Sequence, residues 1–296
     1  MTGMLNQLSE ALAQTVESAG SSVVRVEGRR RLPASGIVWR EDGVIVSANH
    51  VVKRDDNVHV GLPDGSRVSA AIVGRDPSTD LVVLRASSGD LAPVERSDEM
   101  QVGNLVLALG RPGQTVQATL GIVSALGTEP WRTPAGGQVD RYLQTDVVMY
   151  PGFSGGPLVS AGGQVLGLNT SALVRGVSLA LPASSVSRVV DTLLAHGRVR
   201  RGYLGVSTQP ARLPRAISDE LGQETGLLVV SVEDESPADQ GGLVLGDTIV
   251  SFDGREVRHH DDLLALLGGD RVGQKTPLRI LRGGELRTLN VTVGER

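Results

Sequence analysis

The stretch GIVWREDGVIVSANH, residues 36–50, decides the fold class of the first two thirds of the chain. Two apolar runs flank the pair Asp42-Gly43, and an Asp-Gly pair between such runs is a strong hairpin signal. The second run ends in a polar, titratable residue, His50. The stretch therefore predicts antiparallel β structure with a candidate imidazole at the end of a strand.

The same alternation of short apolar runs and turns continues to about residue 181. A second Asp-Gly pair, at residues 64–65, separates two further runs. The expected strands are residues 23–26, 36–39, 44–48, 58–62, 67–69, 81–84, 105–109, 121–126, 165–168 and 177–181. This density of short strands predicts a mainly β fold built from two small barrels.

Two predicted helices frame this region. Apolar residues at helical spacing over residues 4–18 predict an amphipathic helix that packs on the body, with an oligomer contact as the alternative. A second helix is expected to be capped by Ser184 or Ser185 and to end at Gly197. The polar run that follows marks a boundary. The expected organisation is an N-terminal helix (residues 1–20), a barrel domain (residues 21–198) and a small α+β domain (residues 199–296).

The small domain is expected to contain five or six strands and one or two helices. Ser236 followed by Pro237 predicts a helix start, because proline is tolerated in the first turn. Asp261 or His260 is the expected cap of a second helix. Turn pairs at residues 253–254 and 283–284 mark hairpins.

Composition excludes several classes of protein. The chain carries a net charge of −4, and it has only 2 Trp, 3 Tyr and 2 Phe, so a nucleic-acid partner is not expected. It has no cysteine, which removes disulfides, thiolate nucleophiles and thiolate metal sites. The five histidines show no metal-ligand spacing, so neither a metal nor another cofactor is expected.

The sequence as written predicts a cytoplasmic protein. No apolar run reaches the roughly 18 residues that a membrane-spanning helix needs. Polar residues interrupt the N-terminal segment, so no signal peptide and no transmembrane segment are expected. If Met1 stands in place of a removed leader, the cell envelope is the alternative location.

Three residues predict nucleophilic catalysis. Ser154 lies in PGFSGGPL, residues 151–158, where glycines let the backbone turn sharply and aim N–H groups at a bound oxyanion. Asp80 directly precedes an apolar strand, where a partly buried carboxylate needs a partner such as His50. The order His, Asp, Ser is that of a serine protease. An α/β-hydrolase is disfavoured, because no helix start follows Ser154 and its order of residues differs.

Three segments resemble the catalytic segments of the HtrA (DegP/DegQ-like) family. They are ANHVV (residues 48–52), DPSTDL (residues 76–81) and GFSGGP (residues 152–157). GIVSALG (residues 121–127) and RGYLGV (residues 201–206) are similar to further segments of the family. The resemblance implies a two-barrel chymotrypsin-like protease domain followed by a small α+β PDZ domain.

The resemblance also implies roles for individual residues. The implied triad is His50, Asp80 and Ser154. The implied oxyanion hole is formed by the amides of Gly152, Phe153 and Ser154. The implied specificity pocket is lined by Val148, Met149, Leu168, Asn169, Thr170 and Ser171, whose apolar members favour a small or medium aliphatic substrate side chain. The implied carboxylate-binding loop of the PDZ domain is Tyr203, Leu204, Gly205 and Val206.

The implied function is protein quality control by a serine endopeptidase. It would cleave unfolded or damaged proteins, and its PDZ domain would bind hydrophobic C-terminal peptides and regulate the activity. A homotrimer or higher oligomer is expected. The alternative is a latent, chaperone-like scaffold that binds peptides. Phe153 keeps this alternative open, because it stands where the family usually has Asn or Asp. An esterase of the α/β-hydrolase class is a third reading.

Overall fold

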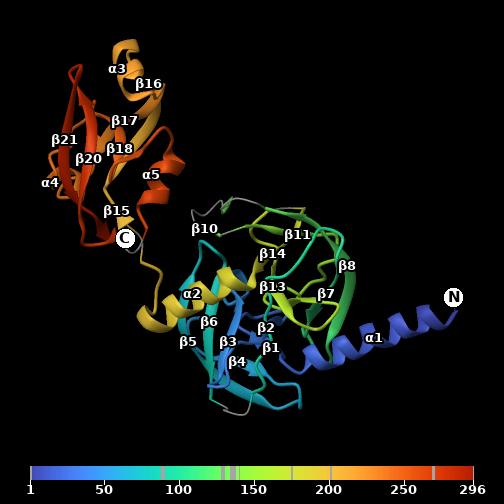
Figure 1. Ribbon diagram of the computed structural model, residues 1–296. Coiled ribbons are helices and arrows are strands. Elements are labelled where there is room, and N and C mark those ends of the chain that lie inside the picture. Colours follow the sequence, from blue (N-terminus) through green and yellow to red (C-terminus); the bar gives the residue numbers. More distant parts are fainter. Residues whose placement is uncertain are drawn as a thin grey trace. The chain divides into compact units, whose positions relative to one another are not determined.

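The computed structural model describes residues 2–87, 91–127, 131–133, 138–139, 141–174, 176–200, 202–268 and 271–295. The chain divides into two compact units, Met1–Val199 and Arg200–Arg296. In Figure 1 the first unit runs from blue to yellow and the second from orange to red. Strands dominate both units, as the apolar runs predict.

The first unit contains two closed six-stranded barrels. The first barrel has the strand order β1-β2-β3-β6-β5-β4, with β1 (Val23–Glu27), β2 (Ala34–Val38), β3 (Val44–Ala48), β4 (Val58–Gly61), β5 (Arg67–Asp76) and β6 (Leu81–Ala86). The predicted turn at Asp42-Gly43 is confirmed, with Gly43 at a φ of 81° between β2 and β3. A short 3₁₀ helix, η1 (Asn49–Val51), follows β3.

The second barrel has the order β11-β14-β13-β12-β7-β8. Its strands are β7 (Leu105–Gly110), β8 (Gln117–Leu126), β11 (Leu143–Thr145), β12 (Pro157–Ser160), β13 (Val165–Thr170) and β14 (Ser178–Pro182). A separate pair is formed by β9 (Trp131–Arg132) and β10 (Gln138–Val139). The predicted two-barrel, mainly β fold is confirmed, although β11 and β12 are absent from the strands expected from sequence.

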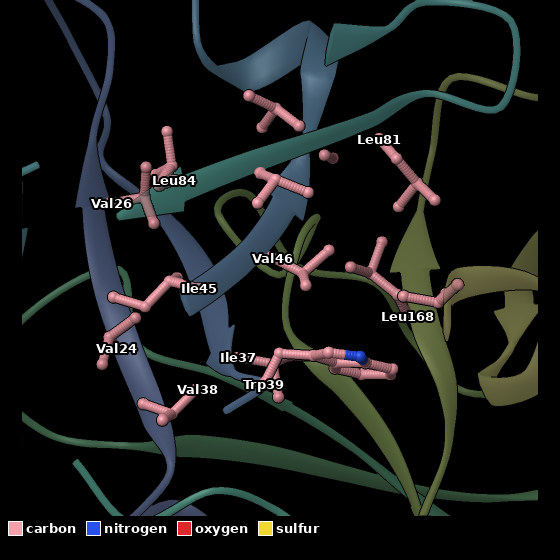
Figure 2. Packing of buried hydrophobic residues seen from close by; sticks show 14 of the residues in the cluster. Val24, Val26, Ile37, Val38, Trp39, Ile45, Val46, Leu81, Leu84 and Leu168 are labelled. Carbon is pink, nitrogen blue, oxygen red and sulfur yellow. The ribbon is translucent and has the colours of Figure 1, made fainter. Parts of the chain in front are cut away.

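The largest core cluster draws side chains from both barrels. Figure 2 shows Ile37, Val46 and Leu84 of the first barrel in this cluster together with Leu168 of β13. All four are fully buried. A second cluster, which includes Phe153 and Leu158, belongs to the second barrel. The two barrels are therefore packed as one body, which fixes the loops that meet between them.

Helix α1 (Thr2–Gly20) confirms the predicted N-terminal helix. Leu12 and Val16 pack against the core, and the Thr15 hydroxyl donates to the carbonyl of Ala161 at 2.8 Å. Met4 and Leu5, near the start of the helix, are exposed. Only the C-terminal part of α1 is thus bound to the barrels.

Helix α2 (Ala183–His196) packs against β5, β6 and β13. Gly197 ends it in the left-handed conformation, with its N–H donating to the carbonyl of Leu193, as predicted. The predicted cap at Ser184 or Ser185 is wrong. Pro182 is the N-cap and makes no side-chain cap, because β14 runs directly into the helix.

The second unit is a six-stranded sheet with the path β16-β17-β18-β20-β21, in which β19 pairs with β18. Its strands are β16 (Val206–Arg212), β17 (Thr225–Val232), β18 (Thr248–Phe252), β19 (Arg255–Glu256), β20 (Lys275–Arg282) and β21 (Glu285–Thr292). β15 (Gly202–Tyr203) pairs with β22 (Gly294–Glu295). The helices are α3 (Arg215–Leu221), α4 (Pro237–Gln240) and α5 (His260–Leu266).

The caps of the second unit follow the predictions in part. The Ser236 side chain caps α4 by accepting from the N–H of Asp239, as predicted. The expected N-cap of α5 was Asp261 or His260. The N-cap is instead His259, because His259 and Asp262 form a reciprocal capping box. Helix α3 was not predicted, and none of its residues is buried. Among the described residues, no helix combines the length and apolar content needed to cross a bilayer.

Candidate active site

His50 and Asp80 meet because their strands are neighbours. Ala48 at the end of β3 pairs with Leu81 at the start of β6, so the residues just outside this ladder lie side by side. His50 Nδ1 lies 2.7 Å from Asp80 Oδ2, and the His50 backbone N–H donates to Asp80 Oδ1 at 2.8 Å. A carboxylate at Nδ1 keeps the proton on that nitrogen, which leaves Nε2 as the acceptor.

The backbone turn before β6 aims Asp80 at the imidazole. Asp80 has a φ of 59°, in the left-handed region, and it is only 4% exposed to solvent. The carboxylate of Asp76 braces the turn by accepting from the Ser78 N–H and from the Thr79 hydroxyl. The Thr170 hydroxyl is a third donor to Asp80, at 2.5 Å from Oδ2. The buried carboxylate is therefore fully partnered.

Arg75 of β5 holds the segment that carries His50. Its guanidinium donates to Asn49 Oδ1 at 3.0 Å, to the Val52 carbonyl at 2.7 Å and to the Arg54 carbonyl at 2.6 Å. These three acceptors lie on both sides of His50. No sequence motif marks Arg75, because its partners are an amide, two backbone carbonyls and the exposed carboxylate of Asp55.

Ser154 lies in the loop before β12 and is 8% exposed. Its Oγ is 3.1 Å from Ser171 Oγ, and no hydrogen bond joins it to His50 among the described residues. Thr170, which binds Asp80, is the neighbour of Ser171. The end of β13 thus brings the predicted nucleophile to the His50–Asp80 pair.

The carbonyls of Gly152, Phe153 and Ser154 each accept a hydrogen bond from the protein. The carbonyl of Gly152 accepts from the Ser35 hydroxyl at 2.7 Å, and that of Ser154 accepts from the Ser35 N–H at 3.3 Å. The carbonyl of Phe153 accepts from the Gly156 N–H at 2.9 Å. All three carbonyls are therefore directed at protein donors and none is left to face a bound anion.

The N–H groups of the same loop differ among themselves. The Phe153 N–H donates to the Tyr150 carbonyl at 3.0 Å, so this member of the predicted oxyanion hole is already engaged. The N–H groups of Gly152 and Ser154 donate to no acceptor among the described residues. Unpaired backbone donors in a folded protein need an explanation, and two on one loop suit an oxyanion.

Side-chain packing fixes this loop as well. Phe153 is fully buried in the core of the second barrel, and its ring meets Tyr150 edge-on, with centroids 5.7 Å apart. Gly152 and Gly155 have φ values of 94° and 88°. A Cβ on Gly155 would lie 2.2 Å from the Ser35 carbonyl oxygen, so only glycine fits there.

The residues of the implied specificity pocket are placed in different environments. Leu168 is fully buried in the shared core, and Asn169 is buried with its amide donating to the Pro157 carbonyl. Met149 packs against the core of the second barrel, whereas Val148 is exposed. The hydroxyls of Thr170 and Ser171 instead form hydrogen bonds with Asp80 and Ser154, respectively. Which of these residues contact substrate stays a prediction.

The implied carboxylate-binding loop has free donors. Gly205 has a φ of 80°, and its carbonyl accepts from the Glu233 N–H, while the Leu204 carbonyl accepts from the Ala238 N–H. The N–H groups of Leu204 and Gly205 have no acceptor among the described residues. β16 follows directly and is an edge strand, open to an added peptide strand. No group of metal-binding side chains occurs in the described parts of the chain.

Each of the two units matches a known domain family. Residues 34–168 match the trypsin-like peptidase domain family, and residues 202–293 match the PDZ domain family. The HtrA-type protease AlgW, solved with a decapeptide, is 30% identical with a TM-score of 0.79 over 96% of this chain and 98% of that one. The chain belongs to the HtrA-type serine proteases. A serine endoprotease from Yersinia pestis is 28% identical, with a TM-score of 0.80 over 96% and 98% of the two chains.

Curated relatives of this HtrA-type chain are longer. A protein of Pseudomonas fulva (strain 12-X) named probable periplasmic serine endoprotease DegP-like is 40% identical over 268 residues, 88% of this chain and 55% of that protein. One of Marinomonas sp. (strain MWYL1) with the same name is 37% identical over 278 residues, 91% and 58% of the two. The chain thus spans little more than half of these relatives.

These findings confirm the predicted family, fold class and enzyme class and overturn one expectation. The relatives are named periplasmic, which points to the cell envelope, so the predicted cytoplasmic location is wrong. That prediction had rested on the polar residues that interrupt the N-terminal segment of the given sequence. The latent-scaffold alternative is not favoured, because the relatives are named serine endoproteases.

Proposed function

We propose that this chain is a serine endopeptidase that cleaves unfolded or damaged proteins. One observation carries the proposal: the paired His50 and Asp80 lie beside a serine loop in which the carbonyls of residues 152–154 are engaged, while the N–H groups of Gly152 and Ser154 have no acceptor in the described parts of the chain. A scaffold that only binds peptides has no need of this combination. The protease domain would comprise residues 21–198 and the PDZ domain residues 199–296.

The geometry supports acyl transfer by the three residues. Rotation of the Ser154 side chain from Ser171 toward His50 Nε2 prepares the nucleophile. Ser154 Oγ attacks the scissile carbonyl while Nε2 takes its proton, and Asp80 stabilises the imidazolium. The N–H groups of Gly152 and Ser154 bind the oxyanion. His50 then protonates the leaving amine, and a water activated by the same imidazole hydrolyses the acyl-enzyme.

The second unit would recognise the substrate's end. Free N–H groups at Leu204 and Gly205 suit a terminal carboxylate, and the edge of β16 suits the preceding residues of the peptide as an added strand. Two solved relatives, AlgW with a decapeptide and AlgW with a tripeptide, are peptide complexes. For this chain we propose hydrophobic C-termini as ligands, a small or medium aliphatic residue before the cleaved bond, and a homotrimer or higher oligomer.

The test is cleavage of an unfolded model protein by the wild type and by Ser154→Ala. We expect wild-type cleavage that Ser154→Ala abolishes, and we expect a peptide with a hydrophobic C-terminus to change the wild-type rate. A fluorophosphonate should label Ser154 in the wild type only. Peptide binding without cleavage and without labelling would instead support the scaffold alternative.

A further inference from the structure

Ser35 is a fully buried residue of β2 that uses every hydrogen-bonding group it has. Its hydroxyl donates to the Gly152 carbonyl at 2.7 Å and accepts from the Arg111 N–H at 2.8 Å. Its own N–H donates to the Ser154 carbonyl at 3.3 Å, and its carbonyl accepts from the Ser47 hydroxyl at 2.7 Å. One residue of the first barrel thus holds two carbonyls of the Ser154 loop, which belongs to the second barrel.

These two bonds determine where the loop's free N–H groups point. The peptide unit between Gly152 and Phe153 is planar, so it is fixed once Ser35 binds its carbonyl and Tyr150 binds its N–H. Glycine has the widest range of backbone conformations of any residue, so hydrogen bonds from other residues are needed to fix the conformation of Gly152. The Ser154 carbonyl, beyond the other free N–H, is restrained by the same residue.

We propose that Ser35 is a positioning residue for the oxyanion hole: by holding the carbonyls of Gly152 and Ser154, it fixes the backbone from which the N–H groups of these same two residues point. The inference rests on the proposed protease function and extends it to a side chain that touches no substrate. It also gives the interface between the barrels a functional role, because loss of the Ser35 hydroxyl would release the Gly152 carbonyl from the first barrel.

Ser47 offers a matched control. Its hydroxyl is equally buried, lies on the adjacent strand β3 and makes one hydrogen bond to a backbone carbonyl, that of Ser35. It donates to no carbonyl of the Ser154 loop. Ser35→Ala and Ser47→Ala therefore each remove one buried hydroxyl from the same strand pair, and only the first releases Gly152.

The experiment measures kcat, KM and the inhibition constant of a peptidyl boronate, a tetrahedral analogue, for both variants and the wild type. Loss of an oxyanion donor costs about 10²–10³ in kcat. We expect Ser35→Ala to lower kcat at least tenfold with KM within twofold, and to weaken the boronate in parallel. Ser47→Ala should leave all three within about threefold. Ser35→Cys, which keeps a weaker donor, should fall between the wild type and Ser35→Ala.

A readout that does not depend on turnover completes the test. The amide proton shifts of Gly152 and Ser154 should move in Ser35→Ala and stay in place in Ser47→Ala. Equal kcat in the two alanine variants, with unmoved amide shifts, would overturn the positioning role. A wild type that neither cleaves nor reacts with fluorophosphonate would overturn the protease function instead. If Ser35→Ala does not fold, Ser35→Cys against Ser47→Cys provides the same comparison.

Discussion

Phe153 precedes the proposed nucleophile, Ser154, yet its side chain is part of the core of the second barrel. Phe153→Ala removes a fully buried ring, which costs about 3–5 kcal/mol of stability, and loosens the peptide units that carry the free N–H groups. Leu158→Ala in the same cluster costs about 2–5 kcal/mol and leaves that loop's backbone bonds intact. We expect both variants to melt at lower temperature. At a temperature where both are folded, only Phe153→Ala should lose more than tenfold in kcat.

Equal kcat for these two folded variants would show that the Phe153 ring serves stability alone. Partial recovery of kcat in Phe153→Leu, which refills much of the cavity, would strengthen the anchoring role.

Substitutions of the neighbours Thr170 and Ser171 should have opposite effects: the first should lower kcat, and the second should raise the rate at which Ser154 is labelled. Thr170→Val keeps the shape of the side chain and removes one donor from the Asp80 carboxylate, so kcat should fall at least about tenfold, in line with about 1.5–3 kcal/mol for a hydrogen bond to a charged group. Ser171→Ala removes the partner that holds the Ser154 hydroxyl, so the rate of fluorophosphonate labelling should rise. Timed fluorophosphonate labelling and steady-state kinetics measure the two effects. A decrease in both variants, or an increase in both, would contradict the prediction.

At the scale of elements, Arg111 joins helix α1 to the barrels. Its buried guanidinium donates to the Val23 carbonyl at 2.6 Å, to the Gln114 carbonyl at 2.7 Å and to the Gly20 carbonyl at the end of α1 at 2.9 Å. Burial lowers the pKa of this guanidinium, and the acceptors of all three hydrogen bonds are backbone carbonyls. Because a hydrogen bond to a charged group contributes about 1.5–3 kcal/mol, Arg111→Met should lower the free energy of unfolding by at least about 2 kcal/mol.

The same substitution should speed hydrogen exchange in the last turn of α1. Arg40→Met, which breaks an exposed ion pair with Asp191, is the control and should cost less than about 1 kcal/mol. Equal losses in the two variants would refute a special role for Arg111.

Helix α5 contacts the edge strand where a peptide would add. His260 Nε2 lies 2.6 Å from the Thr208 carbonyl of β16. A peptide strand must compete with this bond for the carbonyl, so His260→Ala should tighten binding of a hydrophobic C-terminal peptide by up to about tenfold, the equivalent of one hydrogen bond. Thr208→Ala keeps the carbonyl and should not change the affinity. Weaker binding in His260→Ala, measured by calorimetry, would show that the imidazole contacts the peptide.

The elements differ in how far sequence could predict them. Runs of β-branched residues predicted β3 and most of β6. β5 was expected to be three residues long, whereas it extends to Asp76. Its length was underestimated because its later residues include Ala, Gly and Arg. β12 was missed because it begins with Pro157 directly after two glycines. These strands form because the barrel closes around them, and that requirement is absent from any local pattern.

The candidate site divides in the same way. His50 and Asp80 could be found because each stands at the end of an apolar strand, and Ser154 because glycines surround it. Ser35 and Arg75 could not be found, since their partners are mostly backbone groups far away in the sequence. Orientation of a site is set by such bonds, whereas its reactive groups carry the motif.

At the scale of the whole molecule, the proposed protease and peptide-binding units stand in one chain, so we expect peptide binding to assist cleavage. A substrate whose C-terminus is held by the PDZ unit is tethered to the enzyme, and short flexible tethers give effective concentrations of about a millimolar or more. An unfolded substrate that ends in a free hydrophobic carboxylate should therefore have a KM at least about tenfold below that of its C-terminally amidated form, with similar kcat. The amide removes the charge that the Leu204 and Gly205 N–H groups would bind.

Gly205→Val isolates the contribution of that loop. A Cβ at this position would lie 2.3 Å from Ser236 Cβ, and the φ of 80° is unfavourable for valine, so the loop must rearrange. We expect the variant to cleave both substrates with the KM of the amidated one while fluorophosphonate labelling of Ser154 keeps its wild-type rate. If the KM advantage of the free carboxylate survives in Gly205→Val, recognition occurs elsewhere. If labelling falls as well, the PDZ unit acts on the catalytic groups themselves, because tethering alone changes the supply of substrate and not the reactivity of Ser154.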